Sequence, residues 1–431
     1  MAEHRRRRLP STPSLPDPVV RLVRRLGLPV AEVARYWTHE RTALGRGLVA
    51  LVIVAVADLL AGIVLGGFEG DIAELPGLLI LIPAAIAMRG ATFGALGARL
   101  GTAIMTGQFE PSTSRTSYLG RQLEAVGILT LVTSLEAAVI AAIFGRAAGL
   151  EMVPLWDLVV ISVVGGVLAS LILVVVTVSL ARAAYTRGWN MDDVGAPAIT
   201  ATGDLVAIPA LLIAAILATR GAVTLTIAIV VSAATIAALV YGLLHPRPAI
   251  RRLVRESTVV LTGAAAVSVG AGIVLESRAT TFLTIPALLV MFPAFIAMFG
   301  SLGGILSSRL TSKLHLGLIE PRIIPPKLAA LDFSVTYLFG VFIFTVVAFG
   351  TWAAAAMLDV ESPGILPLLG VTLIGGLMGT TLLALVSYGA SAATYRFGLD
   401  PDNHAIPIVT SVMDFLGMLC LVAALAILGV G

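Results

Sequence analysis

The chain has 431 residues, of which 58% are hydrophobic and only 12% are charged. Soluble domains carry about 25% charged residues, so a soluble fold of this size would lack the polar surface it needs. The single cysteine, Cys420, excludes internal disulfides and cysteine metal clusters, and the five scattered histidines form no HExxH pattern. The net charge of +3 does not indicate a nucleic-acid partner, because most of the excess lies in tails and loops on one side of the predicted membrane fold.

Residues 1–45 form a basic N-terminal tail that we expect to be cytoplasmic. The tail has no long apolar run, so the sequence predicts no cleavable signal peptide. Its residues 18–45 are interpreted either as a basic helix that lies on the membrane surface or as a tail without regular structure.

Eleven apolar segments follow, each long enough to cross a bilayer, which takes roughly 20 residues of helix. The second and the eighth are too long for a simple crossing at about 1.5 Å per residue. We expect them to tilt, project or kink, with Pro83 and Pro293 as kink points. The predicted fold class is an all-α membrane protein. The expected spans are 47–68, 76–106, 122–145, 156–184, 196–219, 221–244, 257–276, 284–314, 328–357, 364–394 and 405–429.

The distribution of basic residues predicts the orientation, because Lys and Arg in short loops favour the cytoplasmic side. With the N-terminus inside, 23 of the 28 basic residues fall on that side, and the outer loops hold Arg146, Arg220 and Arg278. The segment 245–256 (HPRPAIRRLVRE) is interpreted as a basic cytoplasmic loop. We therefore expect a multi-pass protein of the cell membrane with a cytoplasmic N-terminus and an outer C-terminus.

The sequence repeats itself at a constant offset. The segment 76–111 matches 286–321 at 16 of 36 positions without a gap, including aligned Pro, Gly, Arg and Glu residues. The offset spans six crossings, so both copies insert with the same orientation. We expect two parallel five-helix repeats, 46–219 and 257–431, joined by a linking transmembrane helix and basic loop at 220–256. Parallel repeats of this kind pack about a pseudo-two-fold axis along the membrane normal.

Charged side chains within the spans are functional candidates, because a charge in hydrocarbon is costly. When the two copies are aligned at this offset, only Asp204 and Asp414 pair with each other. Each lies roughly 15 Å into its helix, with Thr200 and Thr410 one turn earlier on the same face. The remaining candidates pair with uncharged residues and are expected to lie outside the axial site. These candidates are Asp58, Glu124, Glu136 and Asp332.

Two aspartates that face each other on an axis repel unless a proton or a cation lies between them. A divalent cation neutralises the pair, and magnesium is usually held by one or two carboxylates while it keeps several waters. The sequence therefore predicts a metal site at Asp204 and Asp414, supported by Thr200 and Thr410. The alternative is a pair of structural aspartates that are protonated or paired with arginine.

A second pattern shared by the two copies lies at the cytoplasmic ends of the second and eighth spans. There Glu110 and Glu320, each followed by Pro, come after Arg99 and Arg309 at the same spacing, about three helical turns. These four residues are interpreted as a gate or ion vestibule. The alternative interpretation is helix-end capping and ion pairing.

The block PxLLxxxPAxIAMxG…RL…GxxEP, followed by a late helix with PxxT…D, resembles the membrane domain of MgtE-type magnesium transporters. Two such domains in tandem resemble the animal solute-carrier magnesium transporters, over about residues 47–431. The resemblance implies five-helix units around a central pore, with a magnesium-binding aspartate from each fifth helix, here Asp204 and Asp414. One chain would supply both units. Ala91 and Ser301 stand where the family motif has Asn, so the resemblance gives no ligand on that helix.

We therefore expect a transporter of divalent cations, with Mg2+ as the transported ion and Mn2+ or Co2+ as other candidates, and no enzymatic activity. Two other classes stay open at this point. One is a secondary transporter that exchanges a divalent cation for sodium or protons, which Asp58 and Glu136 suggest. The other is an intramembrane aspartyl protease, for which the segment ATGD (201–204) lacks the first glycine of the GxGD signature.

Overall fold

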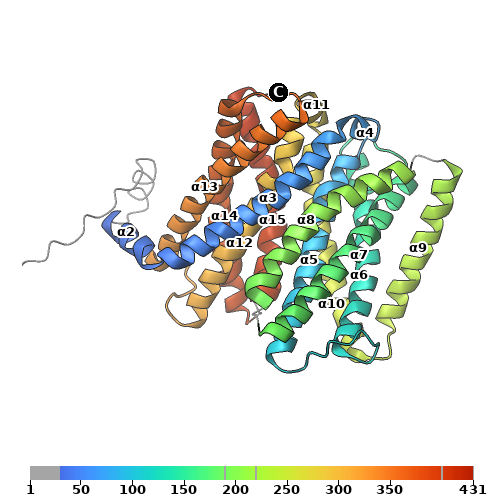
Figure 1. Ribbon diagram of the computed structural model, residues 1–431, viewed down its shortest axis with the longest axis horizontal. Helices are drawn as coiled ribbons and strands as arrows, with labels where there is room; N and C mark the ends of the chain where they lie inside the picture. Colours follow the sequence, from blue (N-terminus) through green and yellow to red (C-terminus); the bar gives the residue numbers. More distant parts are fainter. Residues whose placement is uncertain (1–29, 189–190, 219–220, 399–400, 431) are drawn as a thin grey trace, which may run out of the picture.

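The computed structural model describes residues 30–188, 191–218, 221–398 and 401–430, and these ranges contain helices and no strand. Eleven of the helices are long and apolar enough to cross a membrane, which confirms the predicted all-α membrane fold. The helices are α2 (Val30–His39), α3 (Arg41–Gly67), α4 (Glu69–Ala73), α5 (Leu78–Met105), α6 (Tyr118–Ala147), α7 (Leu155–Arg187), α8 (Met191–Ala218), α9 (Ala222–Leu243), α10 (Pro248–Glu276), α11 (Ala279–Thr284), α12 (Ala287–His315), α13 (Lys327–Leu358), α14 (Ile365–Arg396) and α15 (Pro401–Leu428) (Figure 1).

The spanning helices form two repeats. The first contains α3 and α5–α8, and the second contains α10 and α12–α15. Helix α9 links them and stands at the edge of the bundle, where it packs on α6, α7 and α10 (Figure 1). Most of its apolar surface stays outside the protein core, as expected for a helix that faces lipid. Helices α5 and α12 run as single helices through Pro83 and Pro293, the two predicted kink points.

The basic segment 245–256 is mostly helical, which corrects the predicted loop. Helix α10 begins at Pro248 and not at the expected residue 257. Proline suits the first turn of a helix because its missing N–H needs no partner there. Arg252 and Glu256 then form an ion pair one turn apart, at 2.8 Å, which supports the exposed start of the helix.

The first helix of each repeat packs against the other repeat. Helix α3 lies along α12 and α13, and α10 lies along α5 and α6 (Figure 1). We call α3 and α10 the exchanged helices, because each packs along helices of the other repeat. Each also packs on the fifth helix of its own repeat, α3 on α8 and α10 on α15. The five-helix units expected from the repeat are therefore interlocked and not separate bundles.

Glycines allow the two exchanged helices to approach their neighbours closely. A Cβ atom at Gly62 in α3 would lie 2.0 Å from the carbonyl oxygen of Val290, and one at Gly272 in α10 would lie 2.3 Å from that of Ile80. The two contacts are equivalent, because the alignment of the repeats pairs Gly62 with Gly272 and Ile80 with Val290. Small residues at crossings of this kind let backbones pack tightly in a membrane. The symmetry of the two contacts supports the predicted pseudo-two-fold relation.

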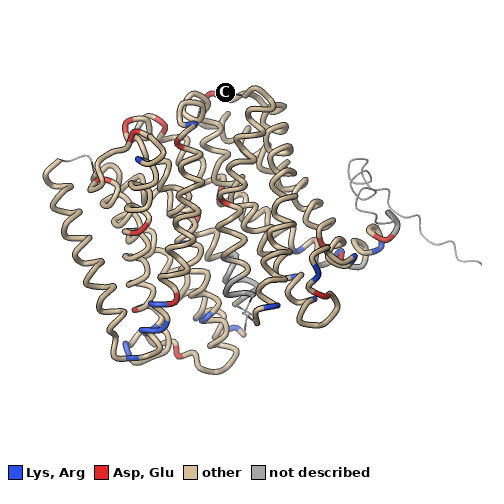
Figure 2. The backbone as a smooth tube through the Cα atoms, turned by 180° about the vertical axis from the view of Figure 1, so that it is seen from behind, with Lys and Arg blue, Asp and Glu red and all other residues tan. Residues whose placement is uncertain are grey.

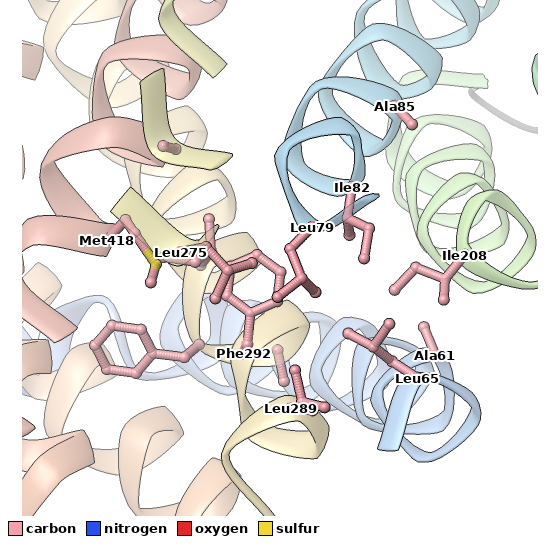
Figure 3. Packing of buried hydrophobic residues seen from close by; sticks show 14 of the residues in the cluster. Ala61, Leu65, Leu79, Ile82, Ala85, Ile208, Leu275, Leu289, Phe292 and Met418 are labelled. Atoms are coloured by element: carbon pink, nitrogen blue, oxygen red, sulfur yellow. The ribbon is translucent and has the colours of Figure 1, made fainter. Parts of the chain in front are cut away.

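A continuous apolar core fills the space where the two repeats meet. Figure 3 shows side chains from α3, α5 and α8 of the first repeat beside those of α10 and α12 of the second. Leu79, Leu275 and Phe292 come together there although they lie on three different helices. This core holds α3, α8 and α10 in fixed positions, and these helices carry the candidate site.

Helix α2 docks on the end of the second repeat through a buried carboxylate. Asp332 of α13 is 0% exposed and accepts hydrogen bonds from Tyr36 (2.8 Å), Arg309 (3.0 Å) and Lys313 (2.5 Å). Arg309 also lies 3.6 Å from Glu40. Figure 2 shows that Lys and Arg gather at the end of the molecule opposite the C-terminus, where this cluster lies. Residues 1–29 of the predicted tail lie outside the described residues.

The glycine crossings generate a prediction for stability. Gly62→Ala or Gly272→Ala should lower the free energy of unfolding by about 2 kcal/mol or more, because the added methyl group overlaps a backbone oxygen that cannot move freely. Gly263→Ala is the matched control in α10, because a Cβ there meets nothing within 4 Å. Thermal unfolding of the purified protein in detergent measures the difference. Equal melting temperatures for Gly62→Ala and Gly263→Ala would contradict the close crossing.

The docked α2 helix generates a second prediction. Asp332→Asn should destabilise the protein by about 3 kcal/mol, because it leaves two cations without their buried carboxylate. Glu256→Gln removes one partner of an exposed ion pair and should change stability by about 0.5 kcal/mol or less. The same melting assay compares the two variants. A similar small effect for both would show that the cluster around Asp332 contributes little to stability.

Candidate metal site

The two aspartates predicted from the repeat occupy equivalent places in equivalent helices. Asp204 lies in α8, which begins at Met191, and Asp414 lies in α15, which begins at Pro401, the position aligned with Met191. Both helices have 28 residues, so each aspartate stands near the middle of its span. Asp204 is 4% exposed and Asp414 is partly buried.

Each aspartate has a partner on the first helix of its own repeat. Ser268 Oγ in α10 donates a hydrogen bond to Asp414 Oδ2 at 3.1 Å. The Asp58 carboxyl group in α3 lies close enough to that of Asp204 for their charges to repel. The alignment of the repeats relates Asp58 to Ser268 and Asp204 to Asp414, so the two pairs are equivalent. The expectation that Asp58 lies outside the axial site is therefore wrong.

The packing around Asp58 supports its place beside Asp204. Figure 3 shows Ala61 and Ile208, each about one turn further along its helix, pointing toward one another between α3 and α8. Asp58 is 0% exposed, and neither of its carboxyl oxygens has a hydrogen-bond partner within the described residues. A buried carboxylate without such partners is costly in a low-dielectric region, and a proton or a cation would lower that cost.

The two repeats also interact with each other through the site. The carboxyl group of Asp414 lies close enough to Asp204 for their charges to repel. Asp58, Asp204 and Asp414 thus bring three carboxyl groups into one region of the membrane interior. Charges of like sign in such a place need a cation or a proton to reduce their repulsion.

The chemistry of these donors suits an ion that keeps part of its water shell. Among the described residues, no group of three or more His, Cys, Asp or Glu side chains is arranged around a common metal position. Magnesium binds proteins through one or two carboxylates while it retains several waters. The Thr410 methyl group lies 3.6 Å from the position of a Cβ at Gly300, so its side chain faces α12. The supporting role of Thr200 and Thr410 stays a prediction.

The four predicted gate residues are not brought together as two Arg–Glu pairs. Arg99 Nε donates to Gln122 at 2.8 Å, and Arg309 joins the cluster around Asp332. Glu320 pairs instead with Arg322 at 2.8 Å, in an exposed loop, and Glu110 is exposed as well. These partners agree with the interpretation as local ion pairing. A role of the four residues in gating stays a prediction.

The other charged candidates have partners at helix interfaces. Glu136 Oε2 in α6 accepts a hydrogen bond from Thr262 in α10 at 3.0 Å, and Glu124 Oε1 accepts one from Tyr241 in α9 at 2.8 Å. Asp332 belongs to the α2 docking cluster. Reasoning from the sequence named Asp58 as a candidate but missed its position beside Asp204. The sequence offered one signal for this position: Asp58 aligns with Ser268, a residue whose hydroxyl group can donate a hydrogen bond to the aspartate of its own repeat.

A polytopic bundle of two parallel repeats, with an aspartate in the middle of the last spanning helix of each, defines a multi-pass membrane protein with buried carboxylates in its interior. Comparison with known proteins agrees. The sequence model of the MgtE family, described as "Divalent cation transporter", matches residues 82–214 and 292–424, once in each repeat. The chain belongs to the MgtE family of divalent cation transporters.

The chain is also similar to animal solute carriers. It is 25% identical to Solute carrier family 41 member 3 of Rattus norvegicus over 365 residues, which cover 80% of this chain and 78% of that protein. It is 24% identical to Solute carrier family 41 member 3 of Mus musculus over 396 residues, which cover 86% and 79%. No solved structure matches the chain.

Proposed function

We propose that this protein transports magnesium across the cell membrane through a pathway at the interface of its two repeats. A largely hydrated ion is held between Asp204 and Asp414 in the middle of the membrane. The single observation that carries the proposal is the symmetric placement of these two aspartates, each with a polar partner from the exchanged helix of its own repeat. One chain contains both repeats and so supplies both aspartates.

The choice of magnesium follows from the number and kind of donors. Two carboxylates offset the charge of a divalent ion, and the few protein ligands leave coordination positions for water, which magnesium releases reluctantly. Manganese and cobalt accept the same oxygen ligands, so they are expected as competing ions. Calcium prefers six to eight oxygen ligands in a more flexible cage, for which the site has too few donors.

The exchanged helices give a physical route from ion binding to movement. Helices α3 and α10 each contact a site aspartate of their own repeat while they pack along the helices of the other. An ion that neutralises the repulsion between Asp204 and Asp414 lets the two repeats approach, and its loss drives them apart. The cytoplasm is proposed to lie on the side of α2, so the ion leaves or enters there near Arg99, Arg309, Glu110 and Glu320.

A secondary transporter that exchanges a divalent cation for sodium or protons is the second candidate. The observation that favours it is the third carboxylate at the site, Asp58, because Asp204 and Asp414 alone match the charge of one divalent ion. Magnesium flux in proteoliposomes under imposed sodium or pH gradients separates the two mechanisms. A pore follows the magnesium gradient alone, whereas an exchanger responds to the second gradient.

The axial pair generates the central functional prediction. Asp204→Asn or Asp414→Asn should reduce magnesium uptake by about tenfold or more, because one remaining carboxylate offsets only half the charge of the ion in a region where charge is costly. The double variant should add little, since the two aspartates act as one site. Uptake by purified protein in liposomes measures the effect. The matched control is Asp359→Asn in the turn after α13, where the residue has φ 54° and asparagine is well tolerated.

The position of Asp58 generates a further prediction, opposite to the expectation from the sequence. Asp58→Asn should raise the KM for magnesium by about tenfold, because it removes a negative charge beside Asp204. Glu136→Gln is the comparison, since Glu136 lies within the membrane but bonds to Thr262 and not to the site. It should leave the KM within about twofold of the wild type. A wild-type KM for Asp58→Asn would show that Asp58 does not contribute to ion binding.

A further inference from the structure

A carboxyl group that the proposed magnesium site does not use lies between α6 and α10. Glu136 stands about three turns before Ala147, the end of α6, and Thr262 stands in the middle of α10, so both residues lie inside their spans. Glu136 is partly buried, and its Oε2 atom lies 3.0 Å from Thr262 Oγ1. A carboxyl group at this depth is costly, which makes it a candidate for a function.

The packing of the helices does not require polar side chains at this interface. The equivalent interface of the bundle, between α13 and α3, has apolar residues at the three matching positions, and they pack against the main apolar core. They are Val346 for Glu136, Val52 for Thr262 and Leu48 for Thr258, which lies one turn before Thr262. Polar residues at all three positions of one interface therefore point to a task that belongs to α6 and α10 alone.

The distances around Thr262 suit a protonated carboxyl group. Thr262 Oγ1 lies 3.0 Å from Glu136 Oε2 and 2.8 Å from the carbonyl oxygen of Thr258. A hydroxyl group has one proton to donate, so an ionised Glu136 competes with that carbonyl group for it. A protonated Glu136 instead donates to Thr262 while Thr262 donates to Thr258, and both contacts are then hydrogen bonds. A proton completes this arrangement, whereas a sodium ion needs more oxygen ligands.

The surroundings of Glu136 do not favour its ionised form. Burial and the Thr262 hydroxyl group are the influences on Glu136, and no charged side chain of the described residues acts on it. Ile140 and Ala265, each about one turn further along α6 and α10, belong to an apolar cluster. An ionised Glu136 in this interface is therefore costly.

Charged groups on the helices packed against α6 and α10 are held elsewhere. Arg89 of α5 donates to Ser134, which faces another side of α6, Glu124 of α6 bonds to Tyr241, Glu256 of α10 pairs with Arg252, Asp414 of α15 accepts from Ser268, Asp157 lies in the first turn of α7, and α9 carries no charged residue. Glu136 is thus an isolated titratable group, which can gain or lose a proton without a compensating charge beside it.

Helix α10 connects this group to the proposed magnesium site. Thr262 and Ser268 lie six residues apart on α10, about 9 Å along its axis, and Ser268 donates a hydrogen bond to Asp414. Because α10 is an exchanged helix, it contacts both repeats. A shift of α10 that separates Thr262 from Glu136 therefore also moves the hydroxyl group beside Asp414.

We propose that Glu136 and Thr262 form a proton-binding site that couples magnesium transport to proton movement. The inference rests on the proposed function and assigns a residue to its exchanger form. A proton on Glu136 keeps α10 against α6. When the proton leaves, the ionised carboxylate is unstable in the apolar interface, and α10 changes its position at Asp414. The proton is taken up at one membrane surface and released at the other, while a magnesium ion moves in the opposite direction.

The path of the proton begins with the hydroxyl groups of α10. Thr258 Oγ1 is buried and has no hydrogen-bond partner in the described part of the chain, so it offers the next oxygen one turn nearer to the start of α10. Glu136 does not bind magnesium in this scheme. Magnesium affinity at a fixed pH is therefore expected to stay near the wild-type value when Glu136 is replaced, and the change appears in the response to protons.

The test measures proton movement driven by magnesium in liposomes that contain the purified full chain, a trapped pH-sensitive dye and a clamped membrane potential. Magnesium entry through the wild type should make the interior alkaline. Glu136→Gln keeps the size of the side chain but cannot release a proton, so the magnesium-driven proton flux should fall by about tenfold or more. Its magnesium uptake should no longer respond to an imposed pH gradient, and its Kd for magnesium by calorimetry should stay within about twofold.

Three further variants separate a proton site from a structural role. Glu136→Asp keeps a titratable carboxyl group and should retain a proton flux that Glu136→Gln lacks. Thr262→Val removes the hydroxyl partner and should lower the proton flux by about threefold or more, which also serves if Glu136→Gln folds poorly. Glu124→Gln is the matched control on the same helix, with a proton flux like that of the wild type.

The proposal is overturned if the wild type carries magnesium without moving protons, if sodium alone drives the exchange, or if Glu136→Gln moves protons like the wild type. An equal loss in Glu124→Gln would also overturn it, because the effect would then not be particular to Glu136. Asp204→Asn is measured alongside. Full magnesium uptake by Asp204→Asn would refute the proposed function itself, whereas an inactive Asp204→Asn with a wild-type proton flux in Glu136→Gln refutes only the role of Glu136.

Discussion

The repulsion between carboxylates in the middle of the membrane is the constraint on which the rest of the structure depends. Water is scarce there, and each buried charge without a partner raises the free energy of the folded protein. Asp204, Asp58 and Asp414 can stay together only if cations or protons offset their charge. In the proposed function that role falls to a small divalent cation that keeps part of its water shell, because such an ion suits the oxygen donors of the proposed site.

The exchanged first helices connect this site to the whole bundle. Helix α3 brings Asp58 to Asp204 and also crosses α12 at Gly62, and α10 brings Ser268 to Asp414 and crosses α5 at Gly272. A change in the distance between the repeats must therefore alter the surroundings of both aspartates. Helix α2 continues into α3 and is attached to the second repeat at Asp332, so the N-terminal end of the bundle is tied to the same helix that carries Asp58.

Much of this arrangement follows from the sequence. The apolar runs predicted all eleven spans, and the internal repeat identified Asp204 and Asp414 as equivalent. The position of Asp58 beside Asp204 was missed because the comparison of the repeats looked for identical residues. The equivalent residue, Ser268, is not an acid but donates a hydrogen bond to Asp414 through its hydroxyl group. The exchange of α3 and α10 was missed because hydropathy gives the spans but not their neighbours. The helical start of α10 was missed because basic residues suit an exposed helix as well as a loop.

The central claim is that Asp204 and Asp414 hold the transported ion between them, and the most direct measurement is a structure of the protein in lipid with Mn2+, located by anomalous scattering. The account predicts one strong peak between α8 and α15, at roughly 4–5 Å from both carboxylates because water lies between ion and protein. Peaks only near Glu110 and Glu320, with none between the aspartates, would contradict it.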